Sequence, residues 1–229
     1  MNDKKCQTLT NKFTKYFDGM DAARENAFKQ GREISKRSSA IIRKLHSEKI
    51  KDLSVLFKEL EEIKGKFITL KSNLKSYPDL YYSNMLENFI QEYVEATVML
   101  TLIKNNLKLT KLPDPDNLGV RYSTYLLGLG DVIGELRRCT LDAIRKQNLK
   151  DASEYLDAME QIFELIIYLN YPDGVLPLRR KQDVARALIE KTRSELAFAV
   201  SEYSLKENIT ELKTELKKYH TTVKGKRKN

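Results

Sequence analysis

Apolar residues recur every three or four positions along most of the chain, which is typical of helices that bury one side. The spacing is most regular between Leu53 and Tyr77, where the intervals alternate between three and four without a break. The pattern predicts seven helices, and no stretch shows the sustained alternation of a strand. Their expected ranges are 10–46, 50–76, 78–107, 120–146, 151–170, 178–203 and 205–220.

One stretch within the third expected helix, Phe89 to Ile103, is apolar on nearly every side, so we expect it to be buried all round. Its only charged residues are Glu92 and Glu95, which are three apart and therefore project from one side of a helix. An unpaired carboxylate in a dry interior is costly, so it protonates, finds a cation or binds a metal. No Lys or Arg lies within the stretch to serve as a local partner.

A second stretch, Ser123 to Leu136, repeats this pattern in the fourth expected helix. Its only charges are Asp131 and Glu135, which are four apart and again share one side. Glycine is a poor helix residue, so three in one helix suggest the close approach of another backbone or of a ligand. The three glycines are Gly128, Gly130 and Gly134.

The loop between the two acidic helices, residues 108–119, contains two prolines and a glycine. Its length lets the two helices return antiparallel as neighbours. Two buried helices that each carry an isolated acidic pair can place four carboxylates around one hard cation. The alternative is that each carboxylate pairs with an Arg or Lys of another helix, which would make the protein a helical scaffold.

The chain of 229 residues has a formal net charge of +9, which favours an anionic partner, with nucleic acid first and an anionic membrane surface second. Spacings of three, four and seven bring several cations to one side of the first helix. They form either a strip that binds phosphate or an ordinary solvated face. The candidate nucleic-acid-binding residues are Lys29, Arg32, Lys36, Arg37, Arg43, Arg137 and Arg138.

Other features narrow the class of protein. Cys6 and Cys139 form no CxxC motif or disulfide framework, which favours a reducing compartment and an inert thiol at Cys139. No stretch approaches ~20 consecutive apolar residues, and the N-terminus has no apolar signal core, so we expect a cytoplasmic protein without a membrane partner. We expect one all-α domain over residues 1–220 and a disordered basic tail over 221–229.

The chemistry that the residue types allow is limited. No glycine-rich phosphate loop follows a strand, and no Glu-x-x-His motif of a di-iron bundle occurs. His46 and His220 are the only histidines, and each is expected at the surface or an interface rather than in catalysis. The Cys and His spacing of a zinc site is absent. An all-carboxylate site suits Mg²⁺ or Mn²⁺.

Three segments resemble the translin family. Residues 91–96 read QEYVEA, residues 125–136 read YLLGLGDVIGEL, and residues 31–46 read GREISKRSSAIIRKLH. The first two are similar to the catalytic stretches of the translin-associated factor X (TRAX) branch. The resemblance implies an all-α, seven-helix fold with long antiparallel helices that assembles into closed, usually octameric, shells around single-stranded RNA. It also implies that the catalytic, metal-binding positions are Glu92, Glu95, Asp131 and Glu135.

By this resemblance we expect an Mg²⁺-dependent endoribonuclease that cleaves single-stranded RNA inside an oligomeric shell. The loop at 108–119 is much shorter than the insertion of animal TRAX chains, which indicates a simpler, archaeal-type homologue. Both a homo-oligomer and a hetero-oligomer with a translin subunit remain open. The alternative function is a non-catalytic member of the family that binds single-stranded RNA or DNA.

Overall fold

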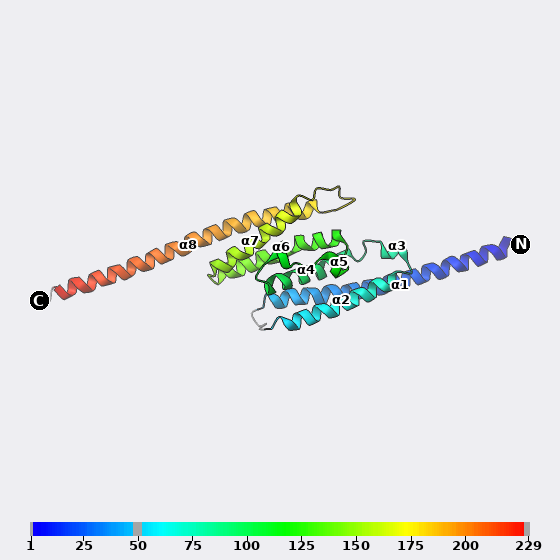
Figure 1. The fold of residues 1–229 in the computed structure, drawn as a ribbon, viewed down its shortest axis with the longest axis horizontal. Helices are drawn as coiled ribbons and strands as arrows, with labels where there is room; N and C mark the ends of the chain where they lie inside the picture. Colours follow the sequence, from blue (N-terminus) through cyan, green and yellow to red (C-terminus); the bar gives the residue numbers. More distant parts are fainter. Residues whose placement is uncertain (1, 48–51, 227–229) are drawn as a thin grey trace.

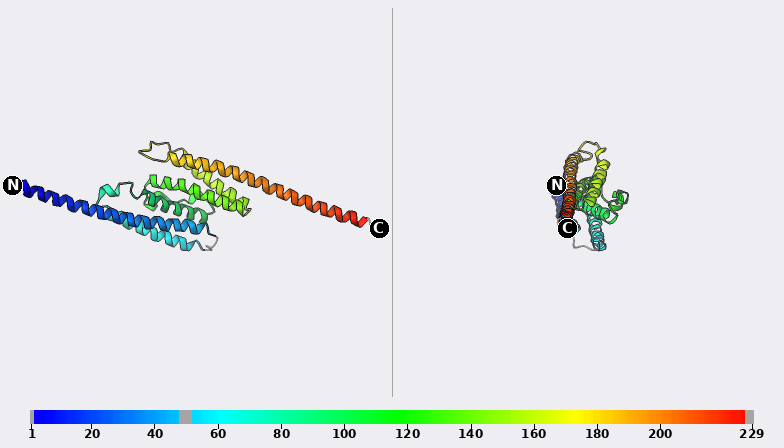
Figure 2. Two further views of the ribbon diagram at one scale, coloured as in Figure 1. Left: turned by 180° about the vertical axis from the view of Figure 1, so that it is seen from behind. Right: turned by 90° about the vertical axis from the view of Figure 1, so that its left-hand side faces the viewer.

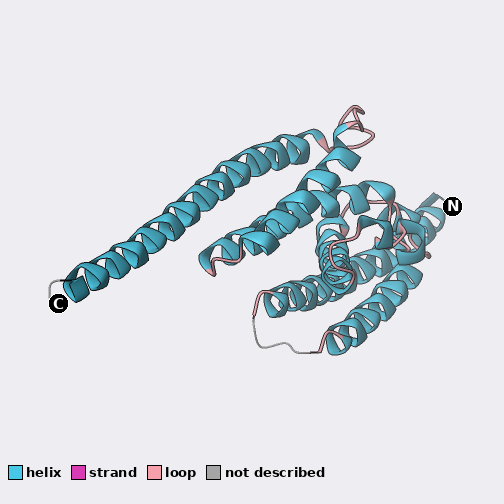
Figure 3. Ribbon diagram, turned by 60° about the vertical axis from the view of Figure 1, so that its left-hand side comes forward, coloured by secondary structure: helices cyan, strands magenta, loops and turns pink. Residues whose placement is uncertain are grey.

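The structure is a computed structural model that describes residues 2–47 and 52–226, with side chains between residues 4 and 219. The described part consists of helices and loops, with no strand (Figure 3), which confirms the all-α class. No helix in it is long and apolar enough to cross a membrane. The elements are α1 (Asn2–Leu45), α2 (Ser54–Leu74), α3 (Pro78–Tyr81), α4 (Glu87–Lys104), the short 3-10 helix η1 (Leu109–Lys111), α5 (Pro115–Leu118), α6 (Tyr122–Arg145), α7 (Leu149–Ile167) and α8 (Arg179–Lys226).

The helix boundaries differ from the sequence prediction at several places, since α1 begins at Asn2 rather than at residue 10 and the predicted loop at 108–119 contains η1 and α5. The third expected helix is broken after α3, where the Ser83 hydroxyl donates to the Leu80 carbonyl and the chain turns before α4 begins. The sixth and seventh expected helices are one continuous helix, α8. This helix includes residues 221–226, which were predicted to be disordered, since no proline interrupts it and a single glycine is tolerated. Residues 227–229 lie outside the described part.

Four helices, α1, α4, α6 and α8, lie side by side in this order and run in the same direction (Figure 1). The helices α2 and α7 return in the opposite direction as the second members of two hairpins, α1–α2 and α6–α7. Seen along the molecule, α1 and α8 lie on one side, while α2 and α7 lie on the other (Figure 2). The apolar stripes of α2 and α7 therefore cover one side of the four-helix layer and leave part of the other side open.

The two acidic helices are parallel neighbours, so the predicted antiparallel arrangement is wrong. Near the start of both helices, the Thr124 hydroxyl donates to Glu87 at 3.2 Å. One turn further along α6 and two turns further along α4, Gly128 faces Val94. The connection is long enough to return along the whole length of α4, because η1, α5 and extended segments between them lead the chain back. Gly119, with φ of 68°, ends α5 in the left-handed conformation that glycine readily adopts.

The α4–α6 contact depends on a glycine. A Cβ atom at Gly128 would lie 2.7 Å from Val94 Cγ1 and 3.3 Å from the Gln91 carbonyl oxygen. A Cβ at Gly130 would meet the side-chain stem of Lys181 at 3.1 Å, whereas one at Gly134 would meet open space. The expected close approach of another backbone is therefore found at Gly128, and room for a neighbouring side chain at Gly130.

Two helical arms extend beyond the layer at opposite ends of the molecule (Figure 1). All described side chains at residues 4–18 of α1 and 200–219 of α8 are exposed. The α8 arm carries the apolar seam that the heptad spacing predicts, with exposed fractions between 42% and 68%. Its members are Leu205, Ile209, Leu212, Leu216 and Tyr219.

We expect Gly128→Ala to lower the free energy of unfolding by ~1–3 kcal/mol, because the new methyl group overlaps Val94. The matched control is Gly134→Ala in the same helix, which meets open space and should be neutral or stabilising by up to ~1 kcal/mol. Urea unfolding of both variants measures the difference. Equal stabilities would contradict the close approach of α4 and α6.

Candidate functional site

The four predicted acidic residues come together on the open side of the layer. Glu92 and Glu95 are on α4, Asp131 and Glu135 are on α6, and all four are partly buried. Burial, followed by the nearby charges of Asp131, Glu135 and Glu92, raises the pKa of Glu95 to about 8, against the opposing effect of Lys181. All three other carboxylates thus act on Glu95, and we call these four residues the acidic cluster.

Glu92 is held by a side chain of α1. The Ser39 hydroxyl donates to Glu92 Oε2 at 2.6 Å, so the first and fourth helices meet at the cluster. Ser39 Oγ also lies 3.0 Å from the Ser35 carbonyl oxygen, so its single hydrogen has two nearby acceptors and the hydroxyl oxygen is held in a defined place. Glu95 itself has neither a hydrogen bond nor an ion pair within the described residues.

Glu135 is held by His46, which directly follows α1. His46 Nε2 lies 2.5 Å from Glu135 Oε2, and its Nδ1 lies 3.7 Å from Cys139 Sγ. The hydrogen bond from His46 lowers the pKa of Glu135 against the opposing effect of burial. The His46 side chain is only 5% exposed, so of the two expected positions, surface or interface, it occupies an interface, the one between the end of α1 and α6. His220 lies outside the residues whose side chains are described.

The thiol of Cys139 beside His46 is not activated. Burial, followed by the charges of Glu135 and Asp142, raises its pKa to about 12. A thiol with so high a pKa stays protonated near neutral pH, and the prediction of an inert cysteine is consistent with this environment.

Asp131 pairs with Lys181, which lies in the first turn of α8. The side-chain exposures of the two residues are 32% and 30%, so the pair is only partly shielded from water. The alternative in which every acidic residue pairs with a Lys or Arg therefore holds for Asp131 and not for Glu92, Glu95 or Glu135 within the described part.

A basic strip borders the acidic cluster. Arg32, Lys36 and Arg43 are exposed and share a side of α1 with Ser39, at spacings of four, three and four. Since Ser39 contacts Glu92, this side of α1 runs past the cluster. Lys29, one turn before Arg32 on the same side, is exposed as well. We call Lys29, Arg32, Lys36 and Arg43 the α1 strip.

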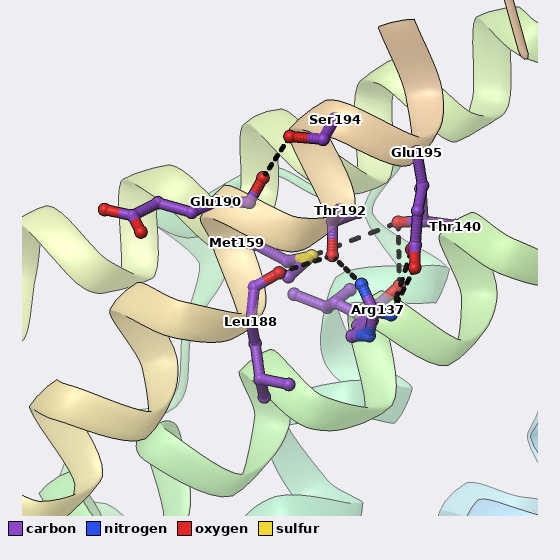
Figure 4. Close-up of polar contacts among 9 residues, drawn as sticks. Arg137, Thr140, Met159, Leu188, Glu190, Thr192, Ser194 and Glu195 are labelled. Carbon is purple, nitrogen blue, oxygen red and sulfur yellow. Dashed lines mark hydrogen bonds and ion pairs between the residues drawn. The ribbon is translucent and has the colours of Figure 1, made fainter. Parts of the chain in front are cut away.

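The other predicted cations divide into two kinds. Arg37 points away from the strip and pairs with Glu62 of α2 at 2.7 Å. Arg137 points toward α8, where it donates to Thr192 Oγ1 at 2.5 Å and pairs with Glu195 at 2.9 Å (Figure 4). Arg138 is exposed, and its charge lowers the pKa of Glu135. Arg37 and Arg137 thus hold helices together, and Arg138 remains beside the cluster.

Sequence reasoning did not identify the three partners Ser39, His46 and Lys181. Ser39 had a detectable signal, because it shares the side of α1 that carries the basic strip. Lys181 also had a detectable signal in the sequence. A cation in the first turn of a helix interacts unfavourably with the helix dipole, so a nearby anion is expected. His46 had no comparable signal, since its contact joins residues 89 positions apart.

The raised pKa of Glu95 predicts a pH-dependent penalty in the metal-free protein. Between pH 4.5 and about 8 the folded state keeps a proton that the unfolded state has lost, so stability falls by up to ~1.4 kcal/mol per pH unit. Glu95→Gln removes this penalty, and its stability relative to wild type should rise across that window. Thermal unfolding in chelator checks this, with the exposed Glu164→Gln as control. A constant difference between pH 4.5 and 8 would contradict it.

Known proteins are similar to this chain in sequence and in fold. A model of the translin family matches residues 22–201. An uncharacterized protein of Methanocaldococcus jannaschii, MJ0175, is 35% identical over 195 residues, which cover 85% of this chain and 84% of that protein. The structure of AfC3PO in complex with duplex RNA is similar with a TM-score of 0.72 and 27% identity, covering 88% of this chain and 98% of the other.

Two further solved structures have a similar fold. AfC3PO is similar with a TM-score of 0.69 and 30% identity, covering 88% and 98% of the two chains. The apo form of NeC3PO has a TM-score of 0.68 and 27% identity, covering 83% of this chain and 96% of its own. The match to the family model, the archaeal relative and the shared fold lead to one conclusion: this chain belongs to the translin family.

Proposed function

We propose that the protein is a metal-dependent endoribonuclease that cleaves single-stranded RNA within an oligomer. One observation supports this most directly. Four carboxylates from two helices converge on a partly open surface, and exposed cations of α1 border them. Carboxylates alone would repel a nucleic acid, and cations alone would only bind it, so their juxtaposition fits a site that binds the RNA backbone and acts on it.

The acidic cluster has the donor chemistry for a hard divalent cation. Carboxylate oxygens suit Mg²⁺ or Mn²⁺, and Glu92, Glu95, Asp131 and Glu135 would hold the ion. Within the described residues no three Asp, Glu, His or Cys side chains are already grouped as a metal site. The four side chains would therefore have to move closer together around the ion, and Asp131 would exchange its contact with Lys181 for the ion. A bound divalent ion would supply an acidified water and neutralise charge at the phosphodiester.

The chain's own residues would position the components. Ser39 and His46 orient Glu92 and Glu135 by hydrogen bonds, which restricts the rotamers of both carboxylates. The α1 strip and Arg138 would bind phosphate oxygens. Such contacts orient the RNA without reading its sequence, so we expect cleavage with little base preference.

Single-stranded RNA and duplex RNA are both candidate substrates and need to be compared directly. The relative AfC3PO forms a complex with duplex RNA, which supports RNA binding by this chain. We propose single-stranded RNA as the substrate, because hydrolysis requires one strand to lie along the strip and the cluster. Single-stranded DNA offers the same phosphates and is expected to bind as well.

The exposed arms support an oligomer. The apolar seam of α8 faces solvent in the single chain, and an unburied seam of this length favours contact with another helix. We propose an octamer, made either of copies of this chain or of this chain together with a translin subunit. Light scattering of the purified protein measures the subunit number.

The second candidate function is RNA binding without cleavage. Its supporting observation is that Glu92, Glu135 and Asp131 are each occupied by a protein partner in the described structure. In this alternative the cluster is a structural junction of α1, α4, α6 and α8, and only the α1 strip serves the nucleic acid.

Cleavage of labelled RNA separates the two candidates. We expect single-stranded RNA to be cut in Mg²⁺ and left intact in chelator, and duplex RNA to be cut more slowly. Glu95→Gln and Asp131→Asn should each reduce the rate on the order of 100-fold or more, because each removes a charged ligand. Glu164→Gln, an exposed change of the same kind, should leave the rate unchanged. Binding without metal-dependent cutting would reject the nuclease and leave the second candidate.

The role of the α1 strip predicts a change in salt dependence. The double variant Arg32→Gln, Lys36→Gln should bind single-stranded RNA more weakly, and its slope of log affinity against log salt should fall by ~0.7 for each lost phosphate contact. The charge-matched control is Arg145→Gln, Lys150→Gln, whose side chains are 74% and 85% exposed. Fluorescence anisotropy over a salt series measures both slopes, and equal losses in the two double variants would reject a localised strip.

A further inference from the structure

Lys181 is placed against the local preference of its helix. It is the third residue of α8, after Arg179 and Arg180, and the first turn contains no acidic residue. The positive end of a helix dipole repels cations, so three in a row need a compensating negative charge. For Lys181 the acidic cluster provides it, because the Lys181 ammonium donates a hydrogen bond to Asp131 Oδ1.

The surrounding structure accommodates the Lys181 side chain. Its Cβ, Cγ and Cδ atoms lie 3.1 to 3.4 Å from the place where a Cβ of residue 130 would be, and residue 130 is glycine. The stem therefore rests directly on the α6 backbone, one residue from Asp131. A Cβ at residue 130 would press on this stem and move it by a few tenths of an ångström, so Gly130 gives the ammonium an unhindered path to the cluster.

The charge of Lys181 acts on more than one carboxylate. It lowers the pKa of Glu95 against the combined effect of burial and the other three acidic residues. Without this ammonium, the cluster would hold its negative charges with less compensation. A divalent ion among the same carboxylates would compete for Asp131 and would repel the ammonium at close range.

We propose that Lys181 is an internal counter-ion of the acidic cluster, which an incoming divalent cation displaces from Asp131. The proposal rests on the metal site of the proposed function. Lys181 then has two opposite effects: it stabilises the metal-free protein, and it weakens metal binding because the ion must first displace the ammonium. The affinity for the metal is therefore set by a residue outside the carboxylate ligands.

The test compares Lys181→Met with the wild type. Methionine keeps an unbranched stem over Gly130 and removes the charge. By isothermal titration with Mn²⁺ and no RNA, we expect the variant to bind about tenfold more tightly, because a competing cation is gone. In chelator its melting temperature should be lower than that of wild type, and Mn²⁺ should raise it by more than it raises that of wild type.

Two further variants control for other effects. Lys206→Met makes the same change in the same helix at another ion-paired lysine, 3.1 Å from Glu202, and should alter neither Mn²⁺ affinity nor the response of the melting temperature. Lys181→Arg keeps the charge and should stay near wild type, which also covers the case in which Lys181→Met does not fold. If Lys181→Arg binds Mn²⁺ several times more weakly or more tightly than wild type, the counter-ion role is rejected.

The outcomes distinguish this inference from the proposed function. If wild type binds Mn²⁺, Asp131→Asn weakens that binding and Lys181→Met leaves it unchanged or weaker, the metal site stands and the counter-ion role is overturned. If wild type binds no Mn²⁺, or Asp131→Asn leaves the affinity unchanged, the metal site itself falls and the inference falls with it.

Discussion

The site depends on the close parallel contact of α4 and α6. Gly128 lets the backbone of α6 approach Val94, and this contact fixes the register of the two helices. In that register the acidic pair of α4 lies at the same level as the acidic pair of α6, so their charges act on one another. The neighbouring elements reach the same level, where Ser39 of α1, His46 just after α1 and Lys181 of α8 contact the acidic residues.

The helices and the core followed from local patterns in the sequence. Leu56, Leu60, Ile63 and Phe67 of α2 are buried at the expected spacing, because amphipathic periodicity needs only neighbouring residues to be read. Helix direction could not be read in this way. It depends on whether the connection at 105–121 turns sharply or returns along α4, and two short helices within it made the longer path possible.

The acidic residues of the site could be identified because they are the only charged residues in otherwise apolar stretches of helix. Glu95 is the clearest example, since a charge in an apolar helix has no local explanation. Their partners could not be identified by the same reasoning. Ser39 and Glu92 are 53 positions apart, and Asp131 and Lys181 are 50 apart, so only the tertiary packing brings each pair together. Tertiary packing also explains why Arg37 and Arg137 were predicted to bind nucleic acid. Each is engaged in an ion pair with another helix, which the linear sequence does not reveal.

The two arms also constrain how copies can join. They leave the molecule at opposite ends, and the α8 arm projects by roughly 1.5 Å per residue beyond the helices it contacts. If each arm bound the next copy at a contact without rotation, growth would be open-ended and would produce a filament. A closed particle requires each contact to turn the next copy by a fixed fraction of a circle. The angle at which an arm meets its neighbour would then determine the number of copies and the width of the enclosed space.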